Sequence, residues 1–266
     1  MRQFLEEIIT EAGRMTLAYR GRGTALAVEH KREKDLVSEA DVAVERFLVE
    51  QIRQRYPQHA IFGEESGSHD GTSTRWLIDP IDGTTSFVRG QPHYSVSIAV
   101  EQAGKTTLAA VYAPALGELY LAERGRGATL NGDPIHVSSR HSLSDSVLAT
   151  GFACIRRNSA YTNVPFLTRL LPQILDVRRY GSAAVDLGYV ASGRLEGFWE
   201  LDLKPYDVAA GFLVVEEAGG RCSDFAGGRQ RRYRQVLATN GHIHDQVVAV
   251  FADVRRELAA QGLHEP

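Results

Sequence analysis

The sequence predicts a mixed fold of two packed halves, an α+β half over residues 1–140 and an α/β half over residues 141–266. Three observations lead to this prediction. Apolar residues recur at helical spacing near the start, strand-like segments follow one another between residues 76 and 122, and strands alternate with helices after about residue 140. A chain of 266 residues is long enough for one large domain or two packed subdomains.

Two amphipathic helices open the first half. The first covers about residues 4–19 and ends at Gly21. A charged loop is expected at 30–35, and Ser38 is the expected N-cap of the second helix, with Asp41 in its first turn. Pro57 closes this second helix.

The remaining elements are predicted from alternation and from turn residues. Asn131–Gly132 is typical of a tight type I′ turn. The expected strands are 76–79, 94–101, 107–113, 117–122, 147–150, 177–180, 197–200 and 236–239. The expected helices of the second half are 161–175, 183–192, 207–218 and 243–258.

Composition excludes several classes of protein. The formal net charge of −3 gives no basic excess, so no nucleic-acid partner is expected. Cys154 and Cys222 are far apart, so we expect free thiols, a reducing compartment and a cytoplasmic location. Glu6 and Glu7 interrupt the N-terminal apolar pattern, which argues against a signal peptide, and no run of about 18 apolar residues predicts a membrane span.

Paired carboxylates follow the strand Trp76–Ile78. Asp79 ends this strand, and Pro80 suits the first corner of a tight turn that brings Asp82 to the same space. Carboxylates this close repel each other unless a cation neutralises them, and Mg²⁺ prefers such oxygen ligands. The next residues, Gly83–Thr85, offer backbone N–H groups and hydroxyls to a phosphate.

Two further acidic segments could complete such a site. Glu64–Glu65 follows the apolar pair Ile61–Phe62, and Asp207 stands at the start of an apolar helix. Each feature has an ordinary alternative: Glu64–Glu65 as a solvated loop, Asp207 as a helix cap, and Asp79 with Asp82 as a turn.

Taken together, these segments resemble the signature motifs of the inositol monophosphatase family. The resemblance extends over the whole chain in order and spacing, and the segment 180–200 is more similar to bacterial inositol-1-monophosphatases than to the histidinol-phosphate branch. The matching segments are Asp35–Asp41, Glu64–Ser66, Asp79–Thr85, Gly181–Ala184, Lys204–Gly211 and Glu217–Gly220.

The resemblance implies a site for two or three Mg²⁺ ions. Glu64, Asp79 and the carbonyl oxygen of Ile81 would hold the first ion. Asp79, Asp82 and Asp207 would hold the second, and a third ion would lie near Glu64 and help to activate water. It also implies lithium sensitivity, a homodimer and the layered αβαβα sandwich of the sugar-phosphatase superfamily.

Catalytic and substrate roles follow from the same resemblance. Glu64 would take part in catalysis, and Thr84, oriented by Asp41, would position the attacking water. The implied substrate contacts are Asp82, Gly83, Thr84, Thr85, Gly181, Ser182, Ala183, Glu200 and Asp207.

The expected function is Mg²⁺-dependent hydrolysis of a small polyol phosphate monoester, with myo-inositol-1-phosphate first and fructose-1,6-bisphosphate or histidinol phosphate as alternatives. Metal-activated water needs no side-chain nucleophile. One different class is a haloacid-dehalogenase-like aspartyl phosphatase, which the three-residue spacing of Asp79 and Asp82 disfavours. Another is a protein that binds a metal or a partner without catalysis.

Some residues near the motifs keep two interpretations. The pairs Arg156–Arg157 and Arg178–Arg179 could bind a second phosphate or lie on solvated loops. Asp202 could favour a hydroxyl-rich substrate or face solvent. The basic run 229–234 is expected to be a surface loop without a nucleic-acid role.

Overall fold

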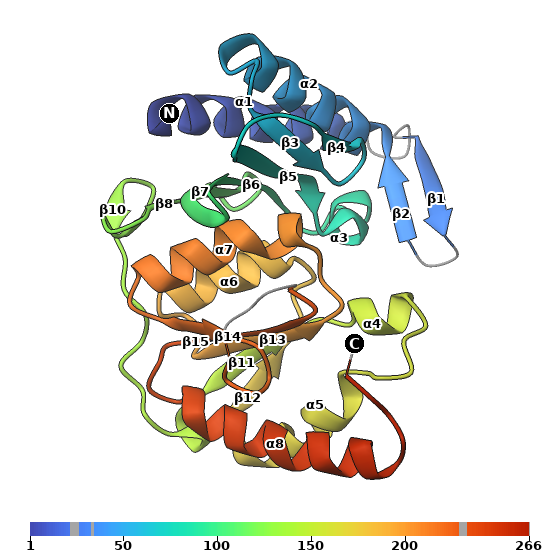
Figure 1. Ribbon diagram of the computed structural model, residues 1–266, viewed down its shortest axis with the longest axis vertical. Coiled ribbons are helices and arrows are strands. Elements are labelled where there is room, and N and C mark those ends of the chain that lie inside the picture. Colours follow the sequence, from blue (N-terminus) through green and yellow to red (C-terminus); the bar gives the residue numbers. More distant parts are fainter. Residues whose placement is uncertain (22–26, 33–34, 229–232, 266) are drawn as a thin grey trace.

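The computed structural model describes residues 1–265 apart from 22–26, 33–34 and 229–232. The elements stack as helices, sheet, helices, sheet and helices along the long axis (Figure 1). This is the αβαβα sandwich that the sequence resemblance implies. The basic run 229–234 lies mostly outside the described residues.

The outer helical layer at the N-terminal end consists of α1 (Arg2–Arg20) and α2 (Glu39–Arg55). Their apolar stripes pack on one face of the first sheet, where Leu5 and Leu48 are fully buried. The N-cap prediction for Ser38 is confirmed, because its backbone N–H donates to Asp41 Oδ2 at 2.8 Å. A two-stranded hairpin beside these helices, β1 (Val28–Arg32) and β2 (Asp35–Ser38), is visible at the edge of the molecule in Figure 1.

The first sheet has eight strands in the order β10-β9-β8-β7-β6-β5-β3-β4. All pairs of adjacent strands in this sheet are antiparallel except β3 and β5, which run parallel. Its strands are β3 (Ala60–Gly63), β4 (Gly67–His69), β5 (Thr74–Asp82), β6 (Ser95–Gln102), β7 (Lys105–Ala113), β8 (Glu118–Glu123), β9 (Ala128–Leu130) and β10 (Asp133–Pro134). The short helix α3 (Thr84–Val88) follows β5.

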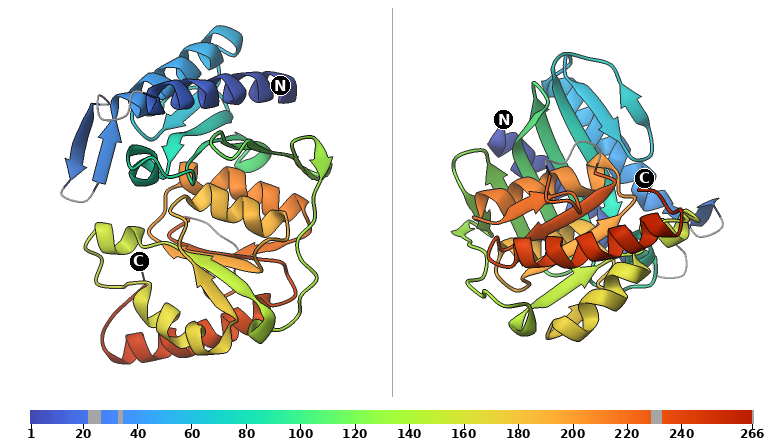
Figure 2. Two further views of the ribbon diagram at one scale, coloured as in Figure 1. Left: turned by 180° about the vertical axis from the view of Figure 1, so that it is seen from behind. Right: turned by 60° about the horizontal axis from the view of Figure 1, so that its bottom comes forward.

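The second sheet has five strands in the order β12-β11-β13-β15-β14. They are β11 (Val147–Thr150), β12 (Asp176–Arg178), β13 (Gly197–Leu201), β14 (Arg221–Ser223) and β15 (Gln235–Thr239). Its outer face is covered by α5 (Val164–Leu170) and α8 (His244–Ala260), with α4 (Ala153–Arg156), η2 (Leu143–Asp145) and η3 (Leu171–Gln173) in the connections (Figure 2).

The middle layer consists of α6 (Ala183–Ala191) and α7 (Pro205–Glu217), which pack between the sheets. Glycine makes their close approach possible: a Cβ at Gly211 would lie 2.5 Å from Leu187 Cδ1. Both helices are almost entirely apolar because sheets cover them on two sides. Each helix begins close to the end of β5, so the N-termini of α6 and α7 both lie near that strand end.

Several boundary predictions are wrong for identifiable reasons. The strand expected to end at Asp79 continues to Asp82, because a register irregularity lets β5 rejoin Ser95 of β6. Most of the charged loop expected at 30–35 is strand, since backbone pairing between β1 and β2 does not require apolar side chains. The helix expected at 161–175 is only α5 and η3, and the strand expected at 177–180 ends at Arg178.

Other predictions are confirmed. Asn131 and Gly132 both have positive φ, at 52° and 90°, as a type I′ turn requires. The free cysteines are also found, and burial raises the pKa of the Cys154 thiol. In the described part of the chain, none of the helices has the length and apolar character needed to cross a bilayer.

Candidate active site

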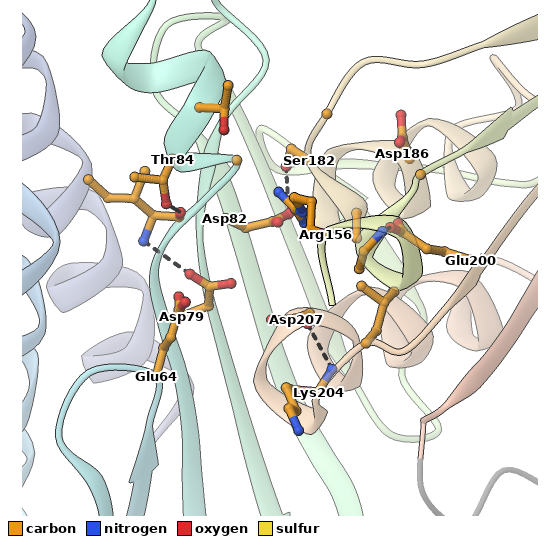
Figure 3. A pocket seen from close by; sticks show the side chains of 18 of the residues that line it. Glu64, Asp79, Asp82, Thr84, Arg156, Ser182, Asp186, Glu200, Lys204 and Asp207 are labelled. Atoms are coloured by element: carbon orange, nitrogen blue, oxygen red, sulfur yellow. Dashed lines mark hydrogen bonds between the residues drawn. The ribbon is translucent and has the colours of Figure 1, made fainter. Parts of the chain in front are cut away.

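A cavity of about 440 Å³ lies between the end of β5 and the end of β13 (Figure 3). Its walls come from the ends of β3, β5, β11 and β13 and from the starts of α6 and α7. Every residue predicted for the metals and the substrate lines this cavity. They are Glu64, Asp79, Ile81, Asp82, Gly83, Thr84, Thr85, Gly181, Ser182, Ala183, Glu200 and Asp207.

Strand pairing places Glu64 beside Asp79. β3 and β5 run parallel, with Gly63 opposite Ile78, and the Glu64 N–H donates to Ile78 O at 3.1 Å. The next residue of β5 is therefore adjacent to Glu64. The carboxyl group of Asp79 is almost fully buried, and burial, followed by the charges of Glu64, Asp82 and Asp207, raises its pKa well above the usual range. A cation in this space would relieve that repulsion.

The N-terminus of α6 fixes one oxygen of Asp82. Asp82 Oδ2 accepts hydrogen bonds from Ser182 Oγ at 2.6 Å and from the Ala184 N–H at 2.7 Å. Burial raises the pKa of Asp82 to about 6, and these donors oppose the rise. Asp82 also lines the cavity.

Asp207 is held in a similar way at the start of α7. Its Oδ2 accepts the Lys204 N–H at 2.7 Å, which completes a capping interaction. Asp207 also lines the cavity, so the cap interpretation and the site interpretation are compatible. Burial, then the charges of Glu64 and Asp82, raise its pKa well above the usual range.

Thr84 connects the turn after β5 to α2. Its Oγ1 lies 3.2 Å from Asp41 Oδ1 and 3.1 Å from Ile81 O. Asp41 is fully buried, and its other oxygen holds Ser38. The predicted pairing of Thr84 with Asp41 is therefore present. Gly83, with φ of 91°, lets the chain turn beneath Gly181 O, which a Cβ would approach to 3.0 Å.

The donor set fits a hard divalent cation. Glu64, Asp79, Asp82, Asp207 and the carbonyl of Ile81 offer oxygen atoms only, as Mg²⁺ prefers. Within the described ranges, no three Asp, Glu, His or Cys side chains gather closely enough to enclose an ion by themselves. Mg²⁺ in proteins commonly keeps several waters and takes substrate phosphate oxygens as further ligands.

The other end of the cavity is built around Glu200. Its Oε1 accepts the Ala153 N–H at 2.8 Å, and a Cβ on Gly151 would lie only 2.1 Å from its Oε2. Gly151 is thus required for Glu200 to lie against the loop after β11. Burial raises the pKa of Glu200 to about 7, while Arg156 and Arg179 lower it.

Four cations line the cavity, and we call them the basic rim: Arg156, Arg157, Arg179 and Lys204. The Arg179 guanidinium lies over Gly181, where a Cβ would approach Nη1 to 2.3 Å. The guanidinium groups of Arg156 and Arg179 form no hydrogen bond or ion pair with another residue that the structure describes. Arg178 points elsewhere and pairs with Asp176.

Asp202 matches neither of its two expectations. It is 1% exposed and forms an ion pair with Arg234, with 2.6 Å between Nη2 and Oδ1. It does not line the cavity. Asp202 directly follows β13 and has a positive φ of 65°, so the regular strand geometry that would place it on the face of Glu200 does not continue to it.

Sequence reasoning missed Asp186 and Lys204. Asp186 lines the cavity from α6, is 1% exposed, and its Oδ1 has no hydrogen-bond partner within the described residues. Burial, then the charges of Glu200 and Asp82, raise its pKa well above the usual range. A lone acid inside the apolar run Ala183–Ala191 was the signal that could have revealed it.

Comparisons with known proteins show similarity over most of the chain. Residues 1–256 match the inositol monophosphatase family. The Nus factor SuhB of Escherichia coli (strain K12) is 44% identical over 238 residues, which cover 88% of each chain. The inositol-1-monophosphatase of Rhizobium meliloti (strain 1021) is 39% identical over 240 residues, which cover 89% of this chain and 90% of that protein.

A solved structure is similar over almost its full length. Inositol monophosphate-bound SaIMPase-II is 26% identical with a TM-score of 0.81, and the match covers 97% of this chain and 96% of that one. The match includes both sheets and the helices between them, so the cavity lies in a shared framework.

Proposed function

Because the chain belongs to the inositol monophosphatase family and is a phosphatase, we propose that it hydrolyses a small polyol phosphate monoester, with myo-inositol-1-phosphate as the first choice. The observation that carries this proposal is the convergence of Glu64, Asp79, Asp82 and Asp207 on one cavity beside Thr84. Mg²⁺ bound there, as two or three ions, would neutralise phosphate charge and supply an activated water.

The chain's own residues would orient the reactants. Thr84 Oγ1 donates its proton to Asp41 or to Ile81 O, so its lone pairs face outward to receive a proton of the attacking water. The N–H groups of Gly83 and Thr84 would receive phosphate oxygens at the start of α3. Asp82 and Asp207 are each oriented by a backbone N–H group and line the cavity, so their carboxylates would be placed to hold the ions. Phosphoryl transfer depends mainly on this positioning.

The polyol would occupy the part of the cavity next to Glu200. Glu200 and the segment Gly181–Ala183 line that part and offer a carboxyl group and backbone groups to hydroxyls. Inositol monophosphate is bound in the similar SaIMPase-II structure. A substrate that leaves a hydrogen bond unmade here would bind more weakly in the transition state. This part of the cavity would therefore determine which alcohol is accepted.

A phosphate ester with a second anionic group, such as fructose-1,6-bisphosphate, is the second candidate. The basic rim favours it, because Arg156 and Arg179 face the cavity without an ion-pair partner among the described residues. We expect Arg156→Gln to reduce activity on the bisphosphate about tenfold more than activity on the monophosphate. Arg178→Gln is the matched control, since Arg178 pairs with Asp176 outside the cavity.

A substrate panel with Mg²⁺ tests the proposal. Phosphate release would be compared as kcat/KM for myo-inositol-1-phosphate, fructose-1,6-bisphosphate, histidinol phosphate, 3′-phosphoadenosine 5′-phosphate and NADP. The highest value for the inositol ester supports the first choice, and a clear preference for histidinol phosphate overturns it. A trapped phospho-aspartate would instead support the aspartyl phosphatase alternative.

Several other features belong to the proposal. The homodimer, the cytoplasmic location and lithium inhibition are implied by family resemblance, and sedimentation and lithium titration would check the dimer and the inhibition. A partner-binding role without catalysis is the different-class alternative, and the relative in Escherichia coli is named a Nus factor. Mg²⁺ binding without phosphate release from any substrate on the panel would favour that alternative.

A further inference from the structure

A second buried carboxylate on α2, Glu45, contacts the loop that carries Glu64. Glu45 is 1% exposed, although it lies on a helix whose other glutamates are more accessible. Its Oε2 accepts the Glu65 N–H at 2.9 Å, and its Oε1 accepts the Ser66 N–H at 2.6 Å. Both oxygens of one carboxylate are therefore used to hold one short turn.

The residue before this turn is shaped to admit the carboxylate. A Cβ at Gly63 would lie 2.5 Å from Glu45 Oε1 and 2.6 Å from its Cδ. Such distances exclude any other amino acid at position 63 without displacement of Glu45. The Glu64 N–H makes the last hydrogen bond between β3 and β5, to Ile78 O. The next two N–H groups along the chain, those of Glu65 and Ser66, donate to Glu45. Glu64 is thus fixed on both sides along the backbone.

Glu45 follows Asp41 by four residues, so the two carboxylates lie on one face of α2. Asp41 holds Thr84, and Glu45 holds the turn after Glu64. Helix α2 therefore holds two loops of the site at a fixed separation. One carries Thr84, which is predicted to position the attacking water, and the other carries Glu64, a predicted metal ligand. Apolar packing of Val44 and Leu48 under the first sheet fixes the helix itself.

We propose that Glu45 is a positioning residue that holds Glu64 at the correct place for divalent cations through the backbone of Glu65 and Ser66. It touches neither substrate nor the reacting atoms. The part of the inference that concerns cations rests on the proposed function, while the part that concerns the turn rests on geometry alone. The two parts can therefore be tested separately.

The variant Glu45→Gln retains the size of the side chain but replaces one acceptor oxygen by a donor amide. One of the two N–H groups would then face a donor. In the metal-free full chain, we expect the amide hydrogens of Glu65 and Ser66 to exchange about tenfold faster. We also expect the Mg²⁺ concentration that gives half of the thermal stabilisation to rise about tenfold, with little change in substrate KM at saturating Mg²⁺.

Glu50→Gln is the matched control, because Glu50 lies on the same helix and is exposed. Gly63→Ala is a second variant, which would displace the Glu45 carboxylate and should reproduce the weaker Mg²⁺ response in a chain that keeps Glu45. Unchanged exchange at Glu65 and Ser66, or an unchanged Mg²⁺ midpoint in both Glu45→Gln and Gly63→Ala, would overturn the inference. Failure of the phosphatase proposal would appear separately, as absent phosphate release in the wild type with these binding readouts intact.

Discussion

Ser182 donates a hydrogen bond of 2.6 Å to Asp82 Oδ2, and this contact joins the two halves of the chain at the centre of the cavity. The same hydroxyl accepts the Val185 N–H at 3.2 Å and so caps α6. Because one side chain makes both contacts, it holds the end of β5 and the start of α6 in a fixed relative position. The carboxylate at this junction is also a predicted metal ligand.

Replacement of Ser182 by alanine should therefore affect both stability and the titration of Asp82. Loss of the cap should lower the free energy of unfolding by about 1–2 kcal/mol. Removal of a donor to the ionised form should raise the pKa of Asp82 above about 6. Thermal unfolding and the pH dependence of kcat/KM would measure these effects. Ser144→Ala, at an exposed position, should change neither; an equal change in both variants would contradict the assignment.

The contact between Asp41 and Thr84 predicts a defect in turnover. Thr84→Ala should lower kcat by about 100-fold or more with KM within about threefold, because the hydroxyl would position water in the chemical step. Asp41→Asn should produce a similar loss, and the double variant should be little worse than either single one. Steady-state kinetics of the three variants checks this. Additive losses would show that the two residues act independently.

Asp186 should destabilise the protein at neutral pH. Its pKa is raised in the folded state, so the unfolded chain ionises first and stability falls as the pH rises above about 4. Each pKa unit of the rise costs about 1.4 kcal/mol. Asp186→Asn should therefore increase Tm at pH 7, and the increase should vanish near pH 4. A lower Tm at pH 7 in the metal-free variant would contradict this explanation.

His244 should make the protein less stable in mild acid. It is fully buried between Ser223 Oγ and Thr239 Oγ1, both at 2.9 Å, and its pKa is lowered to about 4, first by burial. The unfolded chain therefore binds a proton first, and stability present above pH 6.5 is lost as the pH falls towards 4. The loss is at most about 3 kcal/mol.

The pH dependence of urea unfolding, compared between the wild type and His244→Gln, measures this contribution. The variant should show a flatter dependence of the unfolding free energy between pH 6.5 and pH 4. His242→Gln is the control, because His242 is exposed. A flatter profile in the control as well, or none in His244→Gln, would assign the loss to other groups.

Much of the site could be predicted from the sequence because its residues stand in short, ordered motifs at the ends of apolar strands. Asp79 and Asp82 were placed in one space by a proline turn, and this conclusion is right although the turn is in fact a bulged strand end. For Asp207, its position alone favoured a helix cap and the family resemblance implied a site residue; it forms the cap and also lines the cavity.

The residues that were missed depend on tertiary contacts between segments far apart in the chain. Glu45 lies 20 residues before the Glu65 N–H that it receives, and nothing in the local pattern of α2 distinguishes it from exposed glutamates. Arg156 and Arg179 were noticed in the sequence, but their position on one cavity depends on the parallel pairing of β11 with β12. Asp202 was misplaced because its left-handed backbone conformation cannot be inferred from its neighbours.

The central claim is that the cavity carboxylates hold Mg²⁺ for phosphate hydrolysis. The most direct test is the Mg²⁺ titration of phosphate release from myo-inositol-1-phosphate by the wild type and by Asp82→Asn. The account predicts Mg²⁺-dependent turnover in the wild type and a loss of at least about 100-fold in the variant, with its circular dichroism spectrum unchanged. Near wild-type, Mg²⁺-dependent activity in a folded Asp82→Asn protein would contradict it.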